Sequence, residues 1–243
     1  MLGADEVDRY DRQIEVIGVA GQERLKQARV VVAGCGGLGS AAAMYLVAAG
    51  VGALRIVDCD RVSLSNLNRQ VLHWDEDIGR SKVVSASEKL RRLNPSVEIE
   101  GVDEMITEAS VLRLISGFDL IVDATDNLPA RYLLNKAAVE KNMPLFHGAV
   151  YGFEGRVMTV VPGKTACLKC VYRGAFPGAE VPVIGATPAV VGCIQAAEVI
   201  KYVAGIGSLL TNRLLVYDGL NMKFTELGVS RDPGCRHCGK LLG

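Results

Sequence analysis

The chain has 243 residues, and 49% of them are hydrophobic, which is enough to bury the core of one large α/β domain or two small ones. Its 27 basic and 27 acidic residues cancel and form no long block, which argues against nucleic acid as the main partner. No apolar run is long enough to span a membrane, and the acidic N-terminus lacks the features of a secretory signal. We therefore expect a cytoplasmic protein without a membrane partner, whose cysteines bind metal rather than form disulfides.

Residues 1–27 are expected to form an N-terminal helical arm, because apolar residues recur there at helical spacing. Arg9 and Arg12 lie within this arm. By spacing alone both arginines belong to a solvated helix face, so a function for either one needs further support.

The next segment carries the pattern of a nucleotide-binding turn. An apolar run, Val30–Val32, leads into Gly34-x-Gly36-x-x-Gly39, and an alanine-rich helical pattern follows. Gly34 would let the chain turn off the strand, Gly36 would let the backbone approach a phosphate, and Gly39 would let the helix pack close to the strand. The N-terminus of that helix would offer N–H groups to the phosphate.

A second strand, Leu54–Val57, ends on Asp58, at about the 20-residue spacing from the last glycine that is typical of this motif. A carboxylate at that position accepts hydrogen bonds from ribose hydroxyls. The alternative is a tight strand–helix turn that binds nothing. The pattern alone leaves NAD, FAD and ATP open as ligands.

A connection rich in serine and asparagine, residues 59–70, follows at the carboxyl end of the sheet, where open α/β sheets bind ligands. Gly79-Arg-Ser81-Lys82 then opens a helix, with Ser81 as a candidate cap. Lys82 is unfavourable at a helix N-terminus because the helix dipole is positive there. It is either an ordinary surface lysine or a residue that meets a phosphate.

A buried parallel strand, Phe118–Val122, ends in Asp123-Ala-Thr-Asp126-Asn127. Two carboxylates and an amide at the carboxyl end of a strand can hold a magnesium ion together with water. Alternatively, the aspartates cap the helix that starts near Leu128.

The order of these elements predicts an α/β fold, a Rossmann-like, doubly wound, mostly parallel sheet with right-handed crossovers. We expect the nucleotide-binding core to span residues 28–161 and to end in an antiparallel extension of the sheet. Residues 162–243 are expected to add a crossover loop, a helix over residues 189–203, a C-terminal strand pair and a metal-binding tail. The whole chain would form one continuous domain.

Two Cys-x-x-Cys pairs lie in the C-terminal segment, Cys167 with Cys170 and Cys235 with Cys238. Each pair can offer two thiolates from a tight turn, and two pairs complete a tetrahedral zinc site with no open position. We therefore predict a structural zinc clip. The alternative is a redox dithiol, for which one pair would suffice. His237, inside the second pair, is expected to face solvent from a turn, and buried packing is expected for the other cysteines, which are Cys35, Cys59 and Cys193.

Together these stretches resemble the ubiquitin-activating-enzyme-like adenylyltransferases of molybdopterin and thiamine synthesis, the ThiF, MoeB and HesA type. The resemblance covers nearly the whole chain. It rests on the order and spacing of these pieces: Arg9-Tyr-x-Arg12-Gln13, Gly34-x-Gly-Gly-Leu-Gly39, Asp58-x-Asp60, Ser63-Leu-Ser-Asn66-Leu-x-Arg69-Gln70, Gly79-x-x-Lys82, Thr125-Asp126-Asn127 and both cysteine pairs.

The resemblance implies ATP as the nucleotide, magnesium beside it and zinc as a structural ion. Asp126 would bind magnesium, and Arg69 would reach the ATP site of the partner subunit, which implies a homodimer. The residues to which the resemblance gives catalytic roles are Arg12, Arg69, Lys82 and Asp126. Those to which it gives nucleotide contacts are Gly34, Gly36, Gly37, Gly39, Asp58, Asp60, Asn66, Arg69, Lys82 and Asn127.

The reaction implied is adenylation, in which a carboxylate attacks the α-phosphate of ATP, pyrophosphate leaves and an acyl-adenylate forms. The expected carboxylate is the Gly-Gly C-terminus of a ubiquitin-like sulfur-carrier protein. Many relatives carry a cysteine in the crossover loop, but residues 171–191 contain none, so we expect no enzyme thioester. Residues 176–184 also depart from the family pattern, which leaves a small carboxylic acid as an alternative substrate. A NAD-dependent oxidoreductase or a silent nucleotide-binding scaffold would explain only part of the pattern.

Overall fold

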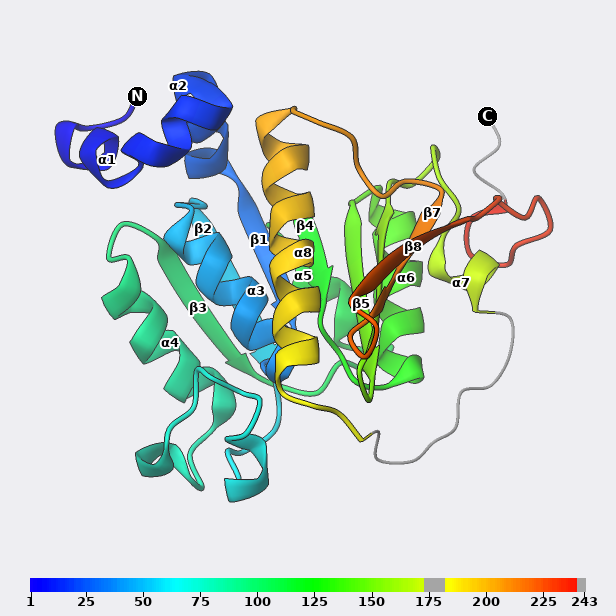
Figure 1. Ribbon diagram of the computed structural model, residues 1–243, viewed down its shortest axis with the longest axis horizontal. Coiled ribbons are helices and arrows are strands. Elements are labelled where there is room, and N and C mark those ends of the chain that lie inside the picture. Colours follow the sequence, from blue (N-terminus) through cyan, green and yellow to red (C-terminus); the bar gives the residue numbers. More distant parts are fainter. Residues whose placement is uncertain (173–181, 240–243) are drawn as a thin grey trace.

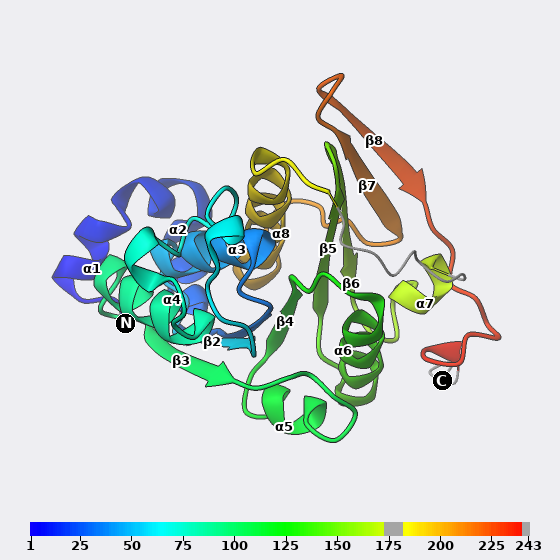
Figure 2. The same ribbon diagram turned by 90° about the horizontal axis from the view of Figure 1, so that it is seen from below.

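The computed structural model describes residues 1–172 and 182–239, which form one eight-stranded sheet with helices on both faces (Figures 1 and 2). The strand order is β3-β2-β1-β4-β5-β6-β7-β8, with parallel pairing from β3 to β5 and antiparallel pairing from β5 to β8. The strands are β1 (Arg29–Ala33), β2 (Ala53–Asp58), β3 (Glu98–Asp103), β4 (Leu120–Asp123), β5 (Leu145–Tyr151), β6 (Glu154–Val160), β7 (Arg213–Asp218) and β8 (Lys223–Gly228). The doubly wound sheet and its antiparallel extension are thus confirmed.

The helices form two layers. The first covers one face of the sheet with α2 (Asp11–Gln27), α3 (Gly37–Ala48), α4 (Lys82–Leu93) and α8 (Ala186–Ala204). The second covers the other face with α5 (Val111–Ile115), α6 (Leu128–Lys141) and α7 (Leu168–Val171). The remaining elements are α1 (Ala4–Arg9) and the 3₁₀ turns η1 (Leu64–Asn66) and η2 (Asp75–Asp77).

Both faces of β1 are buried, which explains its unbroken apolar run. Val30 and Val32 pack into the core under the first helix layer, and Val31 and Ala33 pack into the core under the second. Strands of this kind lie at the centre of parallel sheets because helices cover them on both sides.

Helix α8 fixes the position of the loop between β1 and α3, because it lies directly against α3 (Figure 1). A Cβ at Gly192 of α8 would lie only 2.5 Å from the Leu38 carbonyl oxygen, so a larger residue would push the helices apart. At the other side of the same loop, a Cβ at Gly37 would lie 2.9 Å from Pro188 Cγ and 3.1 Å from the Arg69 carbonyl oxygen. The start of α3 is therefore enclosed by α8 and by the segment after β2.

Three helix boundaries differ from the prediction. The N-terminal arm is two helices, α1 and α2, and α2 itself is kinked at Gly18, whose φ is 70°. The crossover loop expected after residue 161 contains the short helix α7. The helix expected over residues 189–203 is α8, which begins at Ala186 and ends at Ala204. Residues 173–181 of the expected crossover loop lie outside the described residues.

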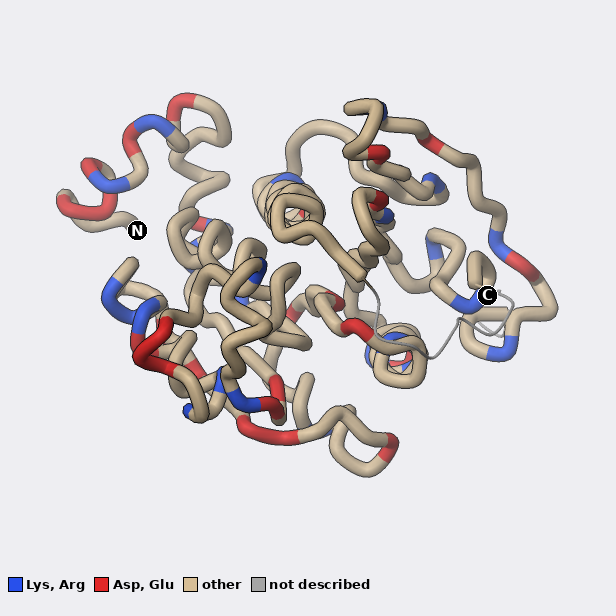
Figure 3. Tube along the Cα trace, turned by 60° about the horizontal axis from the view of Figure 1, so that its bottom comes forward, with Lys and Arg blue, Asp and Glu red and all other residues tan. Residues whose placement is uncertain are grey.

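Acidic and basic residues are interspersed along the described trace (Figure 3). Among residues 1–172 and 182–239, no helix combines the length and the apolar character needed to cross a membrane.

Candidate nucleotide site and cysteine cluster

The turn from β1 into α3 requires glycine at two positions, one in the loop and one in the first turn of α3. Gly34 has a φ of +99°, and a Cβ there would lie 2.6 Å from the Ala124 carbonyl oxygen. A Cβ at Gly39 would lie 1.9 Å from the Gly34 carbonyl oxygen. At Gly36 the nearest atom to such a Cβ is Gln70 Nε2, 3.7 Å away, so other groups can approach the backbone there. The N-terminus of α3 therefore starts beside an accessible strip of backbone, as a phosphate site requires.

Asp58, at the end of β2, binds two backbone N–H groups. Its Oδ2 accepts a hydrogen bond of 2.7 Å from the Cys35 N–H, and its Oδ1 accepts one of 2.8 Å from the Asp60 N–H. Hydrogen bonds to an ionised acceptor are among the stronger ones in proteins. The carboxylate therefore fixes the position of the glycine loop relative to the turn after β2.

Lys82, at the start of α4, is only 5% exposed, so it is not an ordinary surface lysine. Its Nζ lies 2.8 Å from Asp60 Oδ2, and its backbone N–H donates to the Asp60 carbonyl oxygen at 3.0 Å. Ser81 occupies the N-cap position of α4, but its side chain makes no capping hydrogen bond, so that expectation is wrong. The side chain of Asp60 is 61% exposed, which places this ion pair at the edge of the site.

Asn66 and Arg69 lie in the segment that passes beside the glycine loop. Asn66 Oδ1 accepts a hydrogen bond of 3.2 Å from the Ser63 N–H. Arg69 Nη1 donates to the Ser65 carbonyl oxygen at 2.8 Å and to Asn68 Oδ1 at 3.0 Å. Both side chains therefore bind their own turn.

Arg12 is exposed on α2 and lies apart from the other expected site residues. Its neighbour Gln13 donates from Nε2 to the Ala49 carbonyl oxygen at 2.9 Å, and Ala49 is the residue that ends α3. Helix α3 spans 12 residues and is therefore about 18 Å long. Arg12 thus lies near the end of α3 that is opposite to the glycine loop of its own chain.

The loop after β4 separates the three residues expected to hold magnesium. Asn127 caps α6, because its Oδ1 accepts a hydrogen bond of 2.9 Å from the Ala130 N–H. Asp123 is fully buried, and its Oδ2 lies 2.7 Å from His147 Nδ1. The alternative interpretation, in which the aspartates cap α6, is therefore wrong. Asp126 is exposed, so its carboxylate is the one of the two that can meet a ligand.

Asp123 belongs to a buried polar cluster that sequence reasoning missed. Thr125 Oγ1 donates to Asp123 Oδ1 at 2.7 Å, and the Tyr172 hydroxyl lies 3.0 Å from His147 Nε2. Burial raises the pKa of Asp123, but the bond and charge of His147, the charge of Arg131 and the Thr125 hydroxyl outweigh it and leave the pKa lowered. Burial lowers the pKa of His147. The one signal in the sequence was a histidine inside an otherwise apolar strand, since a buried polar group needs a partner.

Four cysteine sulfurs converge from two distant segments. The Sγ atoms of Cys167 and Cys170 are 3.9 Å apart, those of Cys167 and Cys235 are 3.7 Å apart, and those of Cys170 and Cys238 are 3.5 Å apart. A tetrahedron with Zn–S bonds of about 2.3 Å requires S···S separations of about 3.8 Å. Burial raises the pKa of Cys167 to about 11, so a cation is needed to keep that sulfur as a thiolate. The donor set and its spacing therefore fit zinc.

Asn135 of α6 joins both halves of this cluster to the body of the protein. It is fully buried, its Oδ1 accepts a hydrogen bond of 2.9 Å from the Leu168 N–H, and its Nδ2 lies 2.8 Å from His237 Nδ1. The His237 ring also meets the Tyr132 ring edge-on, with 5.9 Å between centroids. His237 is thus half-buried against α6, and the expectation that it faces solvent is wrong.

The other three cysteines lie outside the cluster. Cys35 is buried, Cys193 is half-buried and Cys59 is exposed, so the expectation of buried packing is wrong for Cys59. Burial raises the pKa of all three thiols, and neighbouring aspartates raise that of Cys35 and Cys59 further. None of the three has the lowered pKa that activates a nucleophilic cysteine.

The sequence matches the ThiF family over residues 10–237. It is 46% identical over 248 residues to the sulfur carrier protein adenylyltransferase of Thermus thermophilus, and the alignment covers 97% of this chain and 92% of that protein. It is 40% identical over 247 residues to the molybdopterin-synthase adenylyltransferase of Escherichia coli K12, with 98% and 99% covered. The SAMP-activating enzyme E1 of Haloferax volcanii is 44% identical, with 98% and 91% covered.

The fold is similar to that of Escherichia coli MccB in its crystal structure with ATP. The TM-score is 0.87 and the sequence identity is 25%, with 95% of this chain and 74% of MccB covered.

Proposed function

Because the chain belongs to the ThiF family, we propose that it uses ATP to adenylate the Gly-Gly C-terminus of a ubiquitin-like sulfur-carrier protein. One observation carries the proposal, which is the similarity over nearly the whole chain to enzymes named as adenylyltransferases. The glycine loop, the buried Lys82 and the exposed Asp126 supply the groups that such chemistry needs at the carboxyl end of the sheet.

ATP would bind with its phosphates against the N-terminus of α3, where Gly36 and Gly37 offer backbone N–H groups. Asp58 would accept hydrogen bonds from the ribose, and Lys82 would neutralise phosphate charge. The ion pair of Lys82 with Asp60 holds the ammonium group at the edge of the site before the nucleotide arrives, which reduces the cost of ordering it. A magnesium ion bound at Asp126 would add further neutralisation of the phosphates.

In the bond-making step, a carboxylate oxygen of the carrier attacks the α-phosphorus, and the bond from that phosphorus to the bridging oxygen of pyrophosphate breaks. The product is an acyl-adenylate. The protein supplies position and positive charge, and no covalent nucleophile is required. The raised pKa values of the three cysteines outside the cluster support a reaction without an enzyme thioester.

Arg12 and Arg69 support a homodimer. The guanidinium of Arg69 binds its own turn, and Arg12 lies near the far end of α3, so neither side chain has a described contact with the glycine loop of its own chain. We place both side chains in the ATP site of the partner subunit, which requires both to cross the dimer interface.

The proposal is tested by ATP–pyrophosphate exchange with a purified carrier protein that ends in Gly-Gly. Exchange should require the carrier and should disappear when its terminal glycine is deleted. Exchange supported by a small carboxylic acid but by no carrier would identify the alternative substrate. Binding of NAD without binding of ATP, measured by calorimetry, would overturn the proposal.

The magnesium assignment is tested in the same assay with Asp126→Ala. Exchange should fall sharply in this variant. Glu140→Ala, which removes a half-exposed carboxylate from the other end of α6, should leave exchange unchanged. Full exchange in Asp126→Ala would remove Asp126 from the site.

A further inference from the structure

We propose that His73 is a positioning residue of the nucleotide site, which orients the Cys35–Gly36 peptide so that the Gly36 N–H faces the phosphate side of the glycine loop. His73 is not among the residues that we propose to contact ATP or magnesium. The inference rests on the proposed function, and its test separates the failure of one from the failure of the other.

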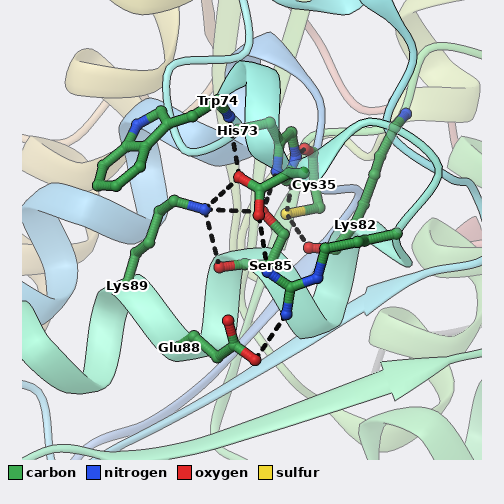
Figure 4. A network of polar contacts seen from close by, with 9 residues as sticks. Cys35, His73, Trp74, Lys82, Ser85, Glu88 and Lys89 are labelled. Carbon is green, nitrogen blue, oxygen red and sulfur yellow. Dashed lines mark hydrogen bonds and ion pairs between the residues drawn. The ribbon is translucent and has the colours of Figure 1, made fainter.

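The backbone of Cys35 is held from both sides. Its N–H donates to Asp58 Oδ2 at 2.7 Å. Its carbonyl oxygen lies 3.1 Å from His73 Nε2, and Figure 4 shows the two residues side by side. His73 is only 3% exposed, and the Cys35 side chain is only 1% exposed. The Cys35 carbonyl therefore points into the protein, toward the imidazole.

Because the peptide bond is planar, the direction of the Cys35 carbonyl also fixes the direction of the Gly36 N–H. In a trans peptide the N–H of one residue points away from the carbonyl of the residue before it. The structure contains no cis peptide among the described residues. With the Cys35 carbonyl directed at His73, the Gly36 N–H is directed the opposite way, away from the imidazole. Gly36 itself is partly exposed, so a ligand can approach its backbone.

The neighbouring residues fix the tautomer that this role needs. A carbonyl oxygen only accepts, so His73 Nε2 must carry the proton, and Nδ1 is left as an acceptor for the Ser85 hydroxyl at 2.9 Å. Lys89 Nζ lies 3.0 Å from Ser85 Oγ and also pairs with the buried Asp77 (Figure 4). Because the ammonium group can only donate, Ser85 Oγ accepts its hydrogen bond and keeps its own proton, which His73 Nδ1 and the Asp77 carboxylate are both placed to accept.

The charges around His73 keep the imidazole neutral. Burial lowers its pKa, and Lys82 and Lys89 lower it further, against the Cys35 carbonyl and Asp77, which raise it. Each polar atom of the imidazole then has one partner of the correct kind, as a buried polar side chain requires.

The experiment measures ATP affinity by calorimetry and exchange kinetics on the full chain. His73→Leu removes the donor, and we expect the Kd and KM for ATP to rise about tenfold while kcat at saturating ATP stays within about twofold. His73→Gln keeps an N–H donor near the position of Nε2 and should restore most of the affinity. In wild-type protein, ¹⁵N spectra should show the Nε2–H tautomer at His73, and the Gly36 amide resonance should move in His73→Leu.

The matched control is Leu90→Ala, a fully buried α4 residue, which should lower the unfolding temperature without changing the Kd for ATP. An unchanged Kd in His73→Leu, in protein whose wild type binds ATP, would overturn the inference and leave the proposed function intact. A proton on Nδ1 in the wild type would also overturn it, and this measurement stands even if His73→Leu does not fold. Failure of the wild type to bind ATP would instead overturn the proposed function.

Discussion

The glycine loop follows β1, whereas the cysteine cluster joins α7 to the segment after β8, and the two are held together in different ways. The glycine loop is shaped by close backbone approaches and by the hydrogen bonds of Asp58. The cysteine cluster is formed by side chains that lie 68 residues apart in the chain, and Asn135 links it to α6. The first is open on one side, whereas the sulfurs of the second are buried.

Because of this difference, we expect the glycine loop to serve ligand binding and the cysteine cluster to serve the stability of the fold. An accessible strip of backbone N–H groups is useful to a ligand and contributes little to the core. A closed set of four sulfurs has no position for a substrate and can only join segments. We therefore expect damage at the glycine loop to appear in nucleotide chemistry, and damage at the cluster to appear in folding.

The largest effect is expected for Cys235→Ser. A structural zinc site contributes on the order of 10 kcal/mol of binding free energy that is coupled to folding, so its loss should release the C-terminal segment and strongly lower the unfolding temperature. Metal analysis should find about one zinc per chain in the wild type and none in the variant. Cys193→Ser, at a half-buried thiol outside the cluster, should keep the metal. Full zinc content in Cys235→Ser would remove that cysteine from the metal site.

The next effect is expected for Lys82→Met, which keeps the aliphatic stem and removes the charge. The rate of pyrophosphate exchange should fall about 10²- to 10³-fold, because a preorganised positive group is lost from the phosphates. The unfolding temperature should change little, since the Asp60 side chain that remains is 61% exposed. Lys136→Met, at an exposed lysine of α6, serves as the control. A large loss of stability in Lys82→Met would show that the two regions do not differ as described.

Asn135→Leu should show the opposite profile. It leaves the buried Leu168 N–H without its acceptor, which should cost about 1–3 kcal/mol of unfolding free energy in urea titrations. Asn135→Asp keeps that acceptor but loses the donor to His237 and buries a carboxylate, so it should also lower the unfolding free energy. The KM for ATP should stay at the wild-type value in both, and an altered KM would mean that the cluster also shapes the nucleotide site.

The smallest effect is a loss of stability in weak acid. Burial lowers the pKa of His147 below its ordinary 6.5. In weak acid the unfolded chain therefore binds a proton at His147, whereas the folded protein leaves this imidazole neutral. The contribution of His147 is therefore fully present above about pH 6.5 and is lost as the pH falls below it, by at most about 1.4 kcal/mol per pH unit. Urea titrations at pH 7.5 and 5.5 measure this change, and His147→Gln should reduce the difference between them.

His147 also tests how separate the two regions are. It binds Asp123 on one side, next to the loop of Asp126, and Tyr172 on the other, just after Cys170. If the regions share this support, acid should weaken zinc retention and ATP affinity in parallel. If acid affects zinc retention alone, they are independent.

Local features of both regions could be predicted from the sequence. The spacing of glycines and cysteines is itself the geometric requirement, because a positive φ or a two-thiolate turn is set within a few residues. The hydrogen bonds that hold these two regions in place could not be predicted. His73 meets Cys35 across 38 residues and His237 meets Asn135 across 102, and no periodic pattern encodes such pairs. The burial of Lys82 was missed for the same reason, since Asp60 approaches it only after β2 and α4 have packed.

The distance along the chain between the two cysteine pairs affects how the protein is made. Cys167 leaves the ribosome 68 residues before Cys235, which at about 5–20 residues per second is an interval of roughly 3–14 s. During that time the parallel strands can already pair, whereas Cys167 and Cys170 still lack the other two cysteines of the cluster. Closing of the cluster therefore comes only after Cys235 has been made, and in the predicted zinc site the metal bound at that stage would secure the C-terminal segment.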